Sequence, residues 1–152
     1  MVQERLSAEA AFARHLLPLA RRWRQAADAA LSELSLSDAN GWVLVHVSRT
    51  PQGIQQGALA DLVDISDASL VRRLHQLEAA GLIAREQDPG NRRANHVRLT
   101  EQGRALAGRI EQSFAALRAT LLADVDDEDL ATANSVLTRL SRSIARLRDA
   151  AP

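Results

Sequence analysis

The sequence of 152 residues contains no cysteine, no lysine and no long apolar run. The absence of cysteine excludes disulfide bonds, cysteine-ligated zinc and thiol redox chemistry, and it fits a reducing compartment. The longest apolar stretches, such as WVLV at residues 42–45, are far shorter than the roughly 20 residues that a membrane span needs. The first residues carry acids and lack the apolar segment of a signal peptide. We therefore expect a soluble, cytoplasmic protein.

Charge is balanced over the whole chain but uneven along it. Nineteen arginines offset 19 acidic side chains, which gives a net charge of zero. Residues 71–100 hold six arginines and three acidic side chains, whereas residues 124–129 read DVDDED. Arginine donates paired hydrogen bonds to phosphate and guanine, so the locally basic middle of the chain is the place to look for a nucleic-acid contact.

The hydrophobic pattern predicts a mainly helical chain. A long helix is expected over residues 8–34, with Pro18 either bending it or marking its true start. A second helix is expected from an N-cap at Ser37 to about residue 48. Two short helices follow over residues 55–64 and 65–81, and Ser66 caps the second of them.

Strands and two further helices complete the predicted order. Residues 82–87 and 95–100 carry β-branched side chains and flank a turn at Asp88-Pro89-Gly90, which predicts a hairpin. A helix capped by Thr100 is expected to reach about residue 123. The last helix follows the acidic run, and its apolar residues repeat at heptad spacing, at Leu130, Leu137, Leu140, Ile144 and Leu147.

The second short helix has two faces of different chemistry. At 100° per residue, its apolar side chains fall within an arc of about 120°; they are Leu70, Val71, Leu74 and Leu77. Ser69, Arg72 and Gln76 lie opposite, and such donors suit base edges and phosphates in a major groove. Two helices followed by a hairpin form the layout of a winged helix-turn-helix.

The hairpin adds a second basic feature. Arg92 and Arg93 follow the turn and are suited to a narrow minor groove, where negative potential is concentrated. Arg85 and Arg98 lie on the predicted strands, within reach of phosphates. Binding through such contacts weakens steeply with salt.

Residues 58–103, ALADLVDISDASLVRRLHQLEAAGLIAREQDPGNRRANHVRLTEQG, resemble the MarR family of winged-helix transcription regulators. The run SLVRRLHQLEAAGLIAR, with RRA and LTEQG after it, is similar to the SlyA branch, as is LARRWRQAADAAL at residues 19–31. The resemblance implies a single domain over residues 1–152, mainly α with a small β-hairpin wing. Residues 8–34 and 101–150 are the expected dimerisation helices, and residues 37–100 the winged helix-turn-helix lobe.

The resemblance also implies function: a nucleoid-associated homodimer that binds a pseudo-palindromic operator in double-stranded DNA. It assigns DNA contacts to Arg72 and to the pair Arg92 and Arg93. Together with the residue pattern, the expected DNA-binding set is Ser66, Ser69, Arg72, Arg73, Gln76, Arg85, Arg92, Arg93 and Arg98. The chain departs from the family at Asn91, where an aspartate usually orients the second arginine. Loss of that charge weakens the support of the wing.

Members of the family often bind small aromatic acids beside the first two helices. The resemblance places such an effector site at Arg21, Arg24, Trp42 and His46. An arginine facing an aromatic ring would hold a carboxylate and stack on a ring. The alternative interpretation is that Trp23 and Trp42 are core residues and that His46 is a neighbour of the core.

Other kinds of site find little support in the sequence. The four histidines lack metal-ligand spacing, and the acidic run lacks the glycine and final glutamate of a calcium loop. No nucleotide-binding or nucleophile motif is present, so we expect no cofactor, no metal and no enzymatic activity. Two alternatives to a simple DNA-binding regulator stay open. One is a winged-helix protein-interaction module that does not bind DNA, and the other is a receptor whose ligand controls DNA binding.

Overall fold

The computed structural model describes residues 2–88 and 91–150, and in this range it leaves the side chains of residues 38, 87, 88, 91–95, 148 and 149 undescribed. The chain falls into two compact units, Met1–Leu117 and Arg118–Pro152. The single domain predicted over residues 1–152 stays a prediction, and each unit is considered by itself below.

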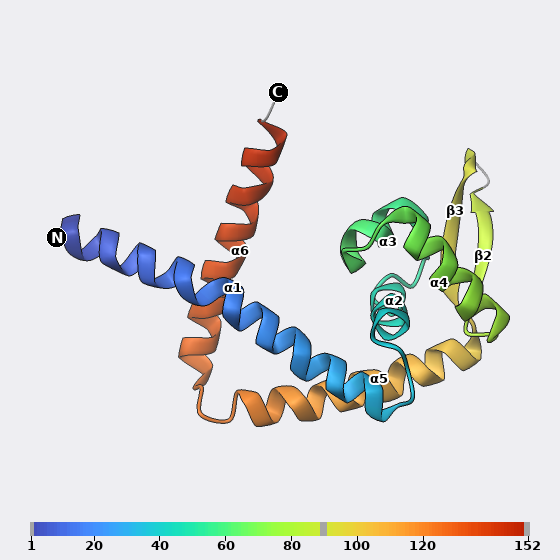
Figure 1. Cartoon of the computed structure of the whole chain (residues 1–152), viewed down its shortest axis with the longest axis horizontal. Coiled ribbons are helices and arrows are strands. Elements are labelled where there is room, and N and C mark those ends of the chain that lie inside the picture. Colours follow the sequence, from blue (N-terminus) through green and yellow to red (C-terminus); the bar gives the residue numbers. More distant parts are fainter. Residues whose placement is uncertain (1, 89–90, 151–152) are drawn as a thin grey trace. The chain divides into compact units, whose positions relative to one another are not determined.

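The elements follow the predicted order with one addition. They are α1 (Val2–Glu33), α2 (Asp38–Ser48), β1 (Ile54–Gln55), α3 (Gln56–Val63), α4 (Asp67–Ala79), β2 (Ile83–Asp88), β3 (Asn91–Leu99), α5 (Glu101–Leu121) and α6 (Asp127–Asp149) (Figure 1). The prediction of a mainly helical chain with a β-hairpin wing is confirmed. The caps at Ser37 and Ser66 lie at the predicted positions.

Helix α1 is longer than predicted, because it begins at Val2 and runs through Pro18. The interpretation that Pro18 marks the helix start is therefore wrong. Proline removes one intrahelical hydrogen bond, but it does not end the helix when the turns on both sides are helical. The residues before position 8, which lack a strong apolar repeat, continue a helix that is already nucleated.

Strand β1 was absent from the sequence-based expectation. Ile54 pairs with Val97 and Gln55 with His96, so the sheet has three antiparallel strands in the order β1-β3-β2. A strand of two residues is too short to show an alternating pattern, and its partner lies more than 40 positions away in the sequence.

Strand β3 begins at Asn91, four residues before the predicted start. Its register with β2 is regular from Leu99 back to Asn95, which pairs with Gln87. The next pair is Asp88 with Asn91, so the ladder is irregular between Gln87 and Asp88. Arg92 and Arg93 thus belong to the backbone of a strand. Two residues of the predicted turn, 89 and 90, lie outside the described residues.

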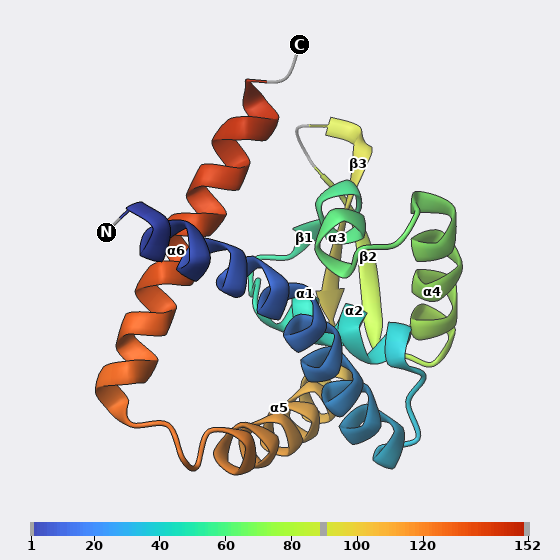
Figure 2. The ribbon, with the colours of Figure 1, turned by 60° about the vertical axis from the view of Figure 1, so that its left-hand side comes forward.

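Helix α2 lies at the centre of the first unit, where it contacts α1, α3, α4 and β3 (Figure 1). Its side chains at Val43, Leu44, Val45 and Val47 are buried. The remaining core comes from one face of each surrounding element, including Leu31 of α1. Strands β2 and β3 contact α4 and α2, and the start of β3 projects past α3 and α4, as Figure 2 shows. The lobe therefore holds α4 and the hairpin on one hydrophobic core.

The second unit contains the end of α5 and all of α6. The carboxylate of Asp126 caps α6 by accepting a hydrogen bond from the backbone N–H of Asp129 at 2.8 Å. The acids that follow favour the positive end of the helix dipole, as the sequence indicated. None of the described residues of α6 is buried.

Candidate DNA-binding surface and effector site

Helix α4 buries one face and exposes the other. Leu70, Leu74 and Leu77 are buried in the core of the lobe. Arg72 and Gln76 are exposed on the opposite side, and Ser69 is half-buried. This is the division that the helical phase predicted. The outward face therefore presents a guanidinium, an amide and a hydroxyl.

Arg72 carries a charge that the described part of the chain does not neutralise. The ion pairs between described side chains involve Arg5, Arg24, Arg85 and Arg98, and none involves Arg72. Arg73, on the next position of α4, is half-buried and is likewise outside these pairs. An exposed arginine that pairs with no described acidic side chain is available to an external anion.

The first turn of α4 is closed by its serine cap. The hydroxyl of Ser66 accepts a hydrogen bond from the backbone N–H of Ser69 at 3.3 Å, and it donates one to Oγ of Ser69 at 3.0 Å. The cap fixes both hydroxyls at the N-terminus of the helix. Ser66 therefore has a structural function in addition to the DNA contact predicted for it.

Arg85 is bound to a carboxylate. Its Nε and one Nη donate hydrogen bonds to Oε2 of Glu78 at 3.0 Å and 2.5 Å. The hydrogen bond from Arg85 is the main reason that the pKa of Glu78 is lowered. The ion pair joins the last turn of α4 to β2. Arg85 was predicted to reach phosphate, but it is engaged within the protein.

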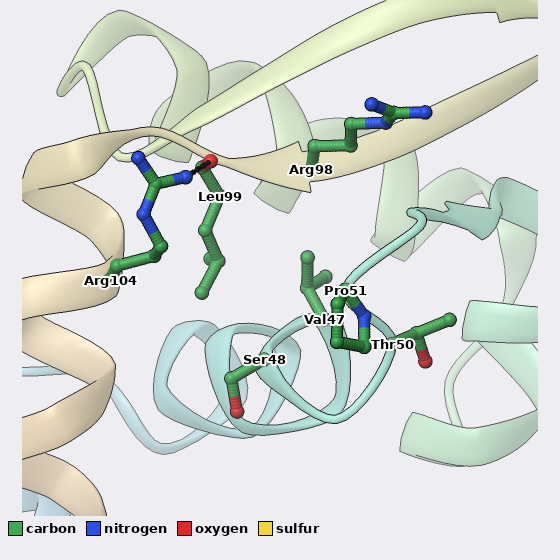
Figure 3. Close-up of a pocket in the computed structure, with 7 residues that line it drawn as sticks. All are labelled: Val47, Ser48, Thr50, Pro51, Arg98, Leu99 and Arg104. Carbon is green, nitrogen blue, oxygen red and sulfur yellow. Dashed lines mark hydrogen bonds between the residues drawn. The ribbon is translucent and has the colours of Figure 1, made fainter.

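Arg98 lies beside a small pocket of about 270 Å³. The pocket is lined by Val47, Ser48, Thr50, Pro51, Arg98, Leu99 and Arg104 (Figure 3). Arg104 donates a hydrogen bond to the carbonyl oxygen of Leu99 at 3.0 Å. The guanidinium of Arg98 points away from that of Arg104, and its Nε lies 3.5 Å from Oε2 of Glu86. Arg98 is still half exposed, which leaves its predicted phosphate contact sterically open.

The wing arginines were the second half of the sequence prediction. The structure describes the backbone of Arg92 and Arg93 within β3, but their side chains lie outside the described part. The same holds for the side chain of Asn91, where the chain departs from the family pattern. Their predicted contacts with DNA stay predictions.

The structure brings together three of the four residues of the predicted effector site. The guanidinium carbon of Arg24 lies over the Trp42 ring, 4.3 Å from its centroid. The His46 ring lies 6.2 Å from the Trp42 ring, tilted by 36°. Arg21 is exposed on α1, and no hydrogen bond, ion pair or ring contact joins it to this group among the described residues. The cluster thus joins α1 to α2.

Two residues that the sequence analysis missed complete the cluster. Oδ1 of Asp28 accepts a hydrogen bond from Nε1 of Trp42 at 2.6 Å and lies 3.5 Å from Nε of Arg24. The ring of Phe114 on α5 lies 5.5 Å from that of Trp42. Asp28 stands four positions after Arg24 on the same helix face, and from this spacing their ion pair could have been predicted. Phe114 is too distant in sequence to have been found by pattern.

The alternative interpretation of the two tryptophans holds in part. Trp42 is half-buried and packs against the core, and His46 beside it is half-buried, whereas Trp23 is 38% exposed. Burial is the main cause that lowers the pKa of His46, and the nearby charges of Arg49 and Arg24 lower it further. Trp42 therefore packs against the core and also donates a hydrogen bond through its indole N–H.

In the part of the chain that is described, no group of three or more histidine and acidic side chains is arranged to hold a metal ion. Among the same residues, no helix is both long and apolar enough to cross a bilayer.

Comparison with known proteins gives a consistent result. A model of the MarR family matches residues 34–94. The solved structure of the transcriptional regulator PA3341 is 33% identical, with a TM-score of 0.81, over 89% of this chain and 98% of that chain. The MarR family transcription regulator SP03579 is 22% identical, with a TM-score of 0.79, over 98% of both chains. The transcriptional regulator SlyA is 23% identical, with a TM-score of 0.73, over 89% of this chain and 94% of that chain.

The likeness to SlyA is one of fold, so the predicted placement in the SlyA branch stays a prediction. The family match spans the part of the chain that contains α2, α3, α4 and most of the wing. Identity with the regulator PA3341 extends over nearly all of that protein. The chain therefore belongs to the MarR family of winged helix-turn-helix transcription regulators.

Proposed function

We propose that the chain acts as a homodimeric regulator that binds a pseudo-palindromic operator, with α4 in the major groove and the β2–β3 wing at the minor groove. The observation that carries the proposal is the outward face of α4. It exposes Arg72 and Gln76, and no described acidic side chain pairs with Arg72. Arginine and glutamine form paired hydrogen bonds with guanine and adenine edges.

The wing and its neighbours supply the proposed backbone contacts. Arg92 and Arg93 probe the minor groove, while Ser66, Arg73 and Arg98 face the phosphates. Arg85 is left out of the phosphate contacts because Glu78 already holds its guanidinium. Such a protein would be found with the nucleoid in the cytoplasm, and the proposed activity is binding without catalysis.

Exposed apolar residues on α1 and α6 support the dimer. On α1 they are Val2, Leu6, Phe12, Leu17, Leu19 and Trp23. On α6, Leu137, Ile144 and Leu147 are exposed and lie on the predicted heptad seam. Apolar stripes of this kind on long helices are stabilised by burial against another helix. A second copy of the chain is the partner that we propose for them.

An effector site for a small aromatic acid is a further part of the proposal. It is supported by Arg24 of α1 and by Trp42 and His46 of α2, which lie together. A ring would stack in the aromatic cluster while a cation holds the acid.

Titration of a fluorescent 30-base-pair A·T-rich palindrome at several salt concentrations tests the DNA-binding proposal. We expect binding that weakens steeply between about 50 and 200 mM salt, because counterions are released from the phosphates. Arg72→Ala should reduce affinity by about tenfold or more, since a paired contact with a base contributes roughly 1–3 kcal/mol. Arg109→Ala, which removes an exposed arginine of α5, is the matched control and should bind as the wild type does.

Absence of binding to any duplex at low salt would favour the protein-interaction module instead. Unchanged affinity in Arg72→Ala would remove α4 from the proposed interface. Light scattering of the wild type and of Leu137→Asp tests the dimer separately, and a wild-type monomer at micromolar concentration would contradict it.

A further inference from the structure

The carboxylate of Asp28 lies where an acidic ligand would have to bind. Its Oδ1 accepts the hydrogen bond of the Trp42 indole N–H and lies close to Nε of Arg24. Trp42 has no other donor on its ring, and the guanidinium of Arg24 lies over that ring. The indole donor of the proposed effector site is therefore already used by the chain itself, and Asp28 also pairs with the cation of the site.

The remaining groups of the cluster offer packing but little positive charge. Phe114 and His46 lie beside the Trp42 ring at tilted angles. Burial lowers the pKa of His46, which favours its neutral imidazole. These rings suit an aromatic ligand, whereas the carboxylate of such a ligand depends on the two groups that Asp28 holds.

We propose that Asp28 is a specificity-determining residue of this site, and that a small aromatic carboxylate binds there by displacing Asp28 from Trp42 and Arg24. The inference rests on the effector site of the proposed function, and it adds the residue that controls entry. An intramolecular carboxylate competes at a high effective concentration, so it weakens the binding of acids in particular. A neutral aromatic molecule meets no such competition, because it has no charge for Arg24 to bind.

Displacement of Asp28 would also change a contact between helices. Asp28 belongs to α1, and Trp42 belongs to α2 at the centre of the lobe that carries α4. An acid that takes the place of Asp28 removes a hydrogen bond of 2.6 Å between these two helices. This is the step through which the ligand would reach the DNA-binding lobe, and linkage requires DNA and acid to affect each other's affinity equally.

Calorimetric titration with sodium benzoate compares the wild type with Asp28→Asn. The asparagine oxygen still accepts the Trp42 hydrogen bond, but it carries no charge to hold Arg24. We expect benzoate to bind Asp28→Asn about tenfold more tightly, because charge-assisted hydrogen bonds are about twice as strong as neutral ones. In a Trp23→Phe background the emission of Trp42 should change on binding, which places the ligand at this ring. If Asp28→Asn does not unfold cooperatively, Asp28→Ser replaces it.

Two controls separate the charge of Asp28 from general effects. Glu33→Gln removes an exposed carboxylate from the same helix, and its affinity for benzoate should remain that of the wild type. Benzamide, which has the ring without the charge, should gain nothing in Asp28→Asn.

The proposal is overturned if Asp28→Asn binds benzoate no better than the wild type, or if either control shows the same gain. Binding of the wild type to duplex DNA without ligand is measured beside these titrations. Its failure would count against the proposed function, whereas failure of the benzoate series alone would count against the inference.

Discussion

Glu78, in the last turn of α4, is hydrogen-bonded to Arg85 of β2 through both Nε and Nη, at 3.0 Å and 2.5 Å. The pair joins the helix that reads the major groove in our proposal to the first strand of the wing. An arginine held in this way sets the position of β2 instead of meeting phosphate. Because both side chains are partly exposed, the ion pair between Glu78 and Arg85 contributes on the order of 0–1 kcal/mol to folding. The main effect of the ion pair is therefore to fix the position of β2 against α4.

The salt dependence of DNA binding tests whether Arg85 positions β2 or contacts a phosphate. Each phosphate contact adds about 0.9 to the slope of log K against log salt concentration. We expect the double variant Glu78→Gln/Arg85→Gln, which removes both charges together, to keep the wild-type slope. A slope reduced by about 0.9 for each lost contact would show that Arg85 meets phosphate after all. Fluorescence anisotropy over a salt series measures it.

The burial of His46 predicts a pH dependence of stability. Folding lowers the pKa of His46 from its ordinary value of 6.5, so the unfolded chain binds this proton more readily. The free energy of unfolding should therefore fall as pH decreases below about 6.5. His46→Gln should flatten this part of the curve. Urea denaturation at pH 5.5 and 7.5 tests both.

A close backbone approach makes Gly103 irreplaceable. A Cβ at this position of α5 would lie 1.9 Å from the carbonyl oxygen of Leu82, which is backbone and cannot rotate aside. Gly103→Ala should lower the free energy of unfolding by about 2 kcal/mol or more. Gly108→Ala, on the same helix with open space around it, should raise it by about 0.5–1 kcal/mol. Equal effects in thermal denaturation would contradict the packing argument.

The two serine caps predict different costs for the same substitution. The side chain of Ser66 accepts the N–H of Ser69, whereas that of Ser37 makes no capping hydrogen bond. Ser66→Ala should lower the free energy of unfolding by about 1 kcal/mol, and Ser37→Ala by clearly less. Because Ser66 opens α4, its loss should also weaken DNA binding through fraying of that helix. A larger stability loss in Ser37→Ala would overturn the assignment.

Patterns local to the sequence predicted most of the helices and the faces of α4. The helical period alone predicted two opposite faces of α4, and the structure has them. The buried face carries Leu70, Leu74 and Leu77, and the exposed face carries Arg72 and Gln76. The effector cluster was predicted only in part. Arg24, Trp42 and His46 came from resemblance and lie together, while no hydrogen bond, ion pair or ring contact joins Arg21 to them among the described residues.

What the sequence by itself determined is what depends on neighbours within a few positions: the capped helix α4, its two faces, the wing arginines on a hairpin, and the family. Only the tertiary structure decided the contacts between distant positions. It added β1, which exists because Ile54 pairs with Val97, and it engaged Arg85 with Glu78. It also placed Asp28 against Trp42, fourteen positions away. The physical reason is that a helical period acts within one element, whereas the partner of a strand or of a side-chain acceptor on another element depends on how the elements pack.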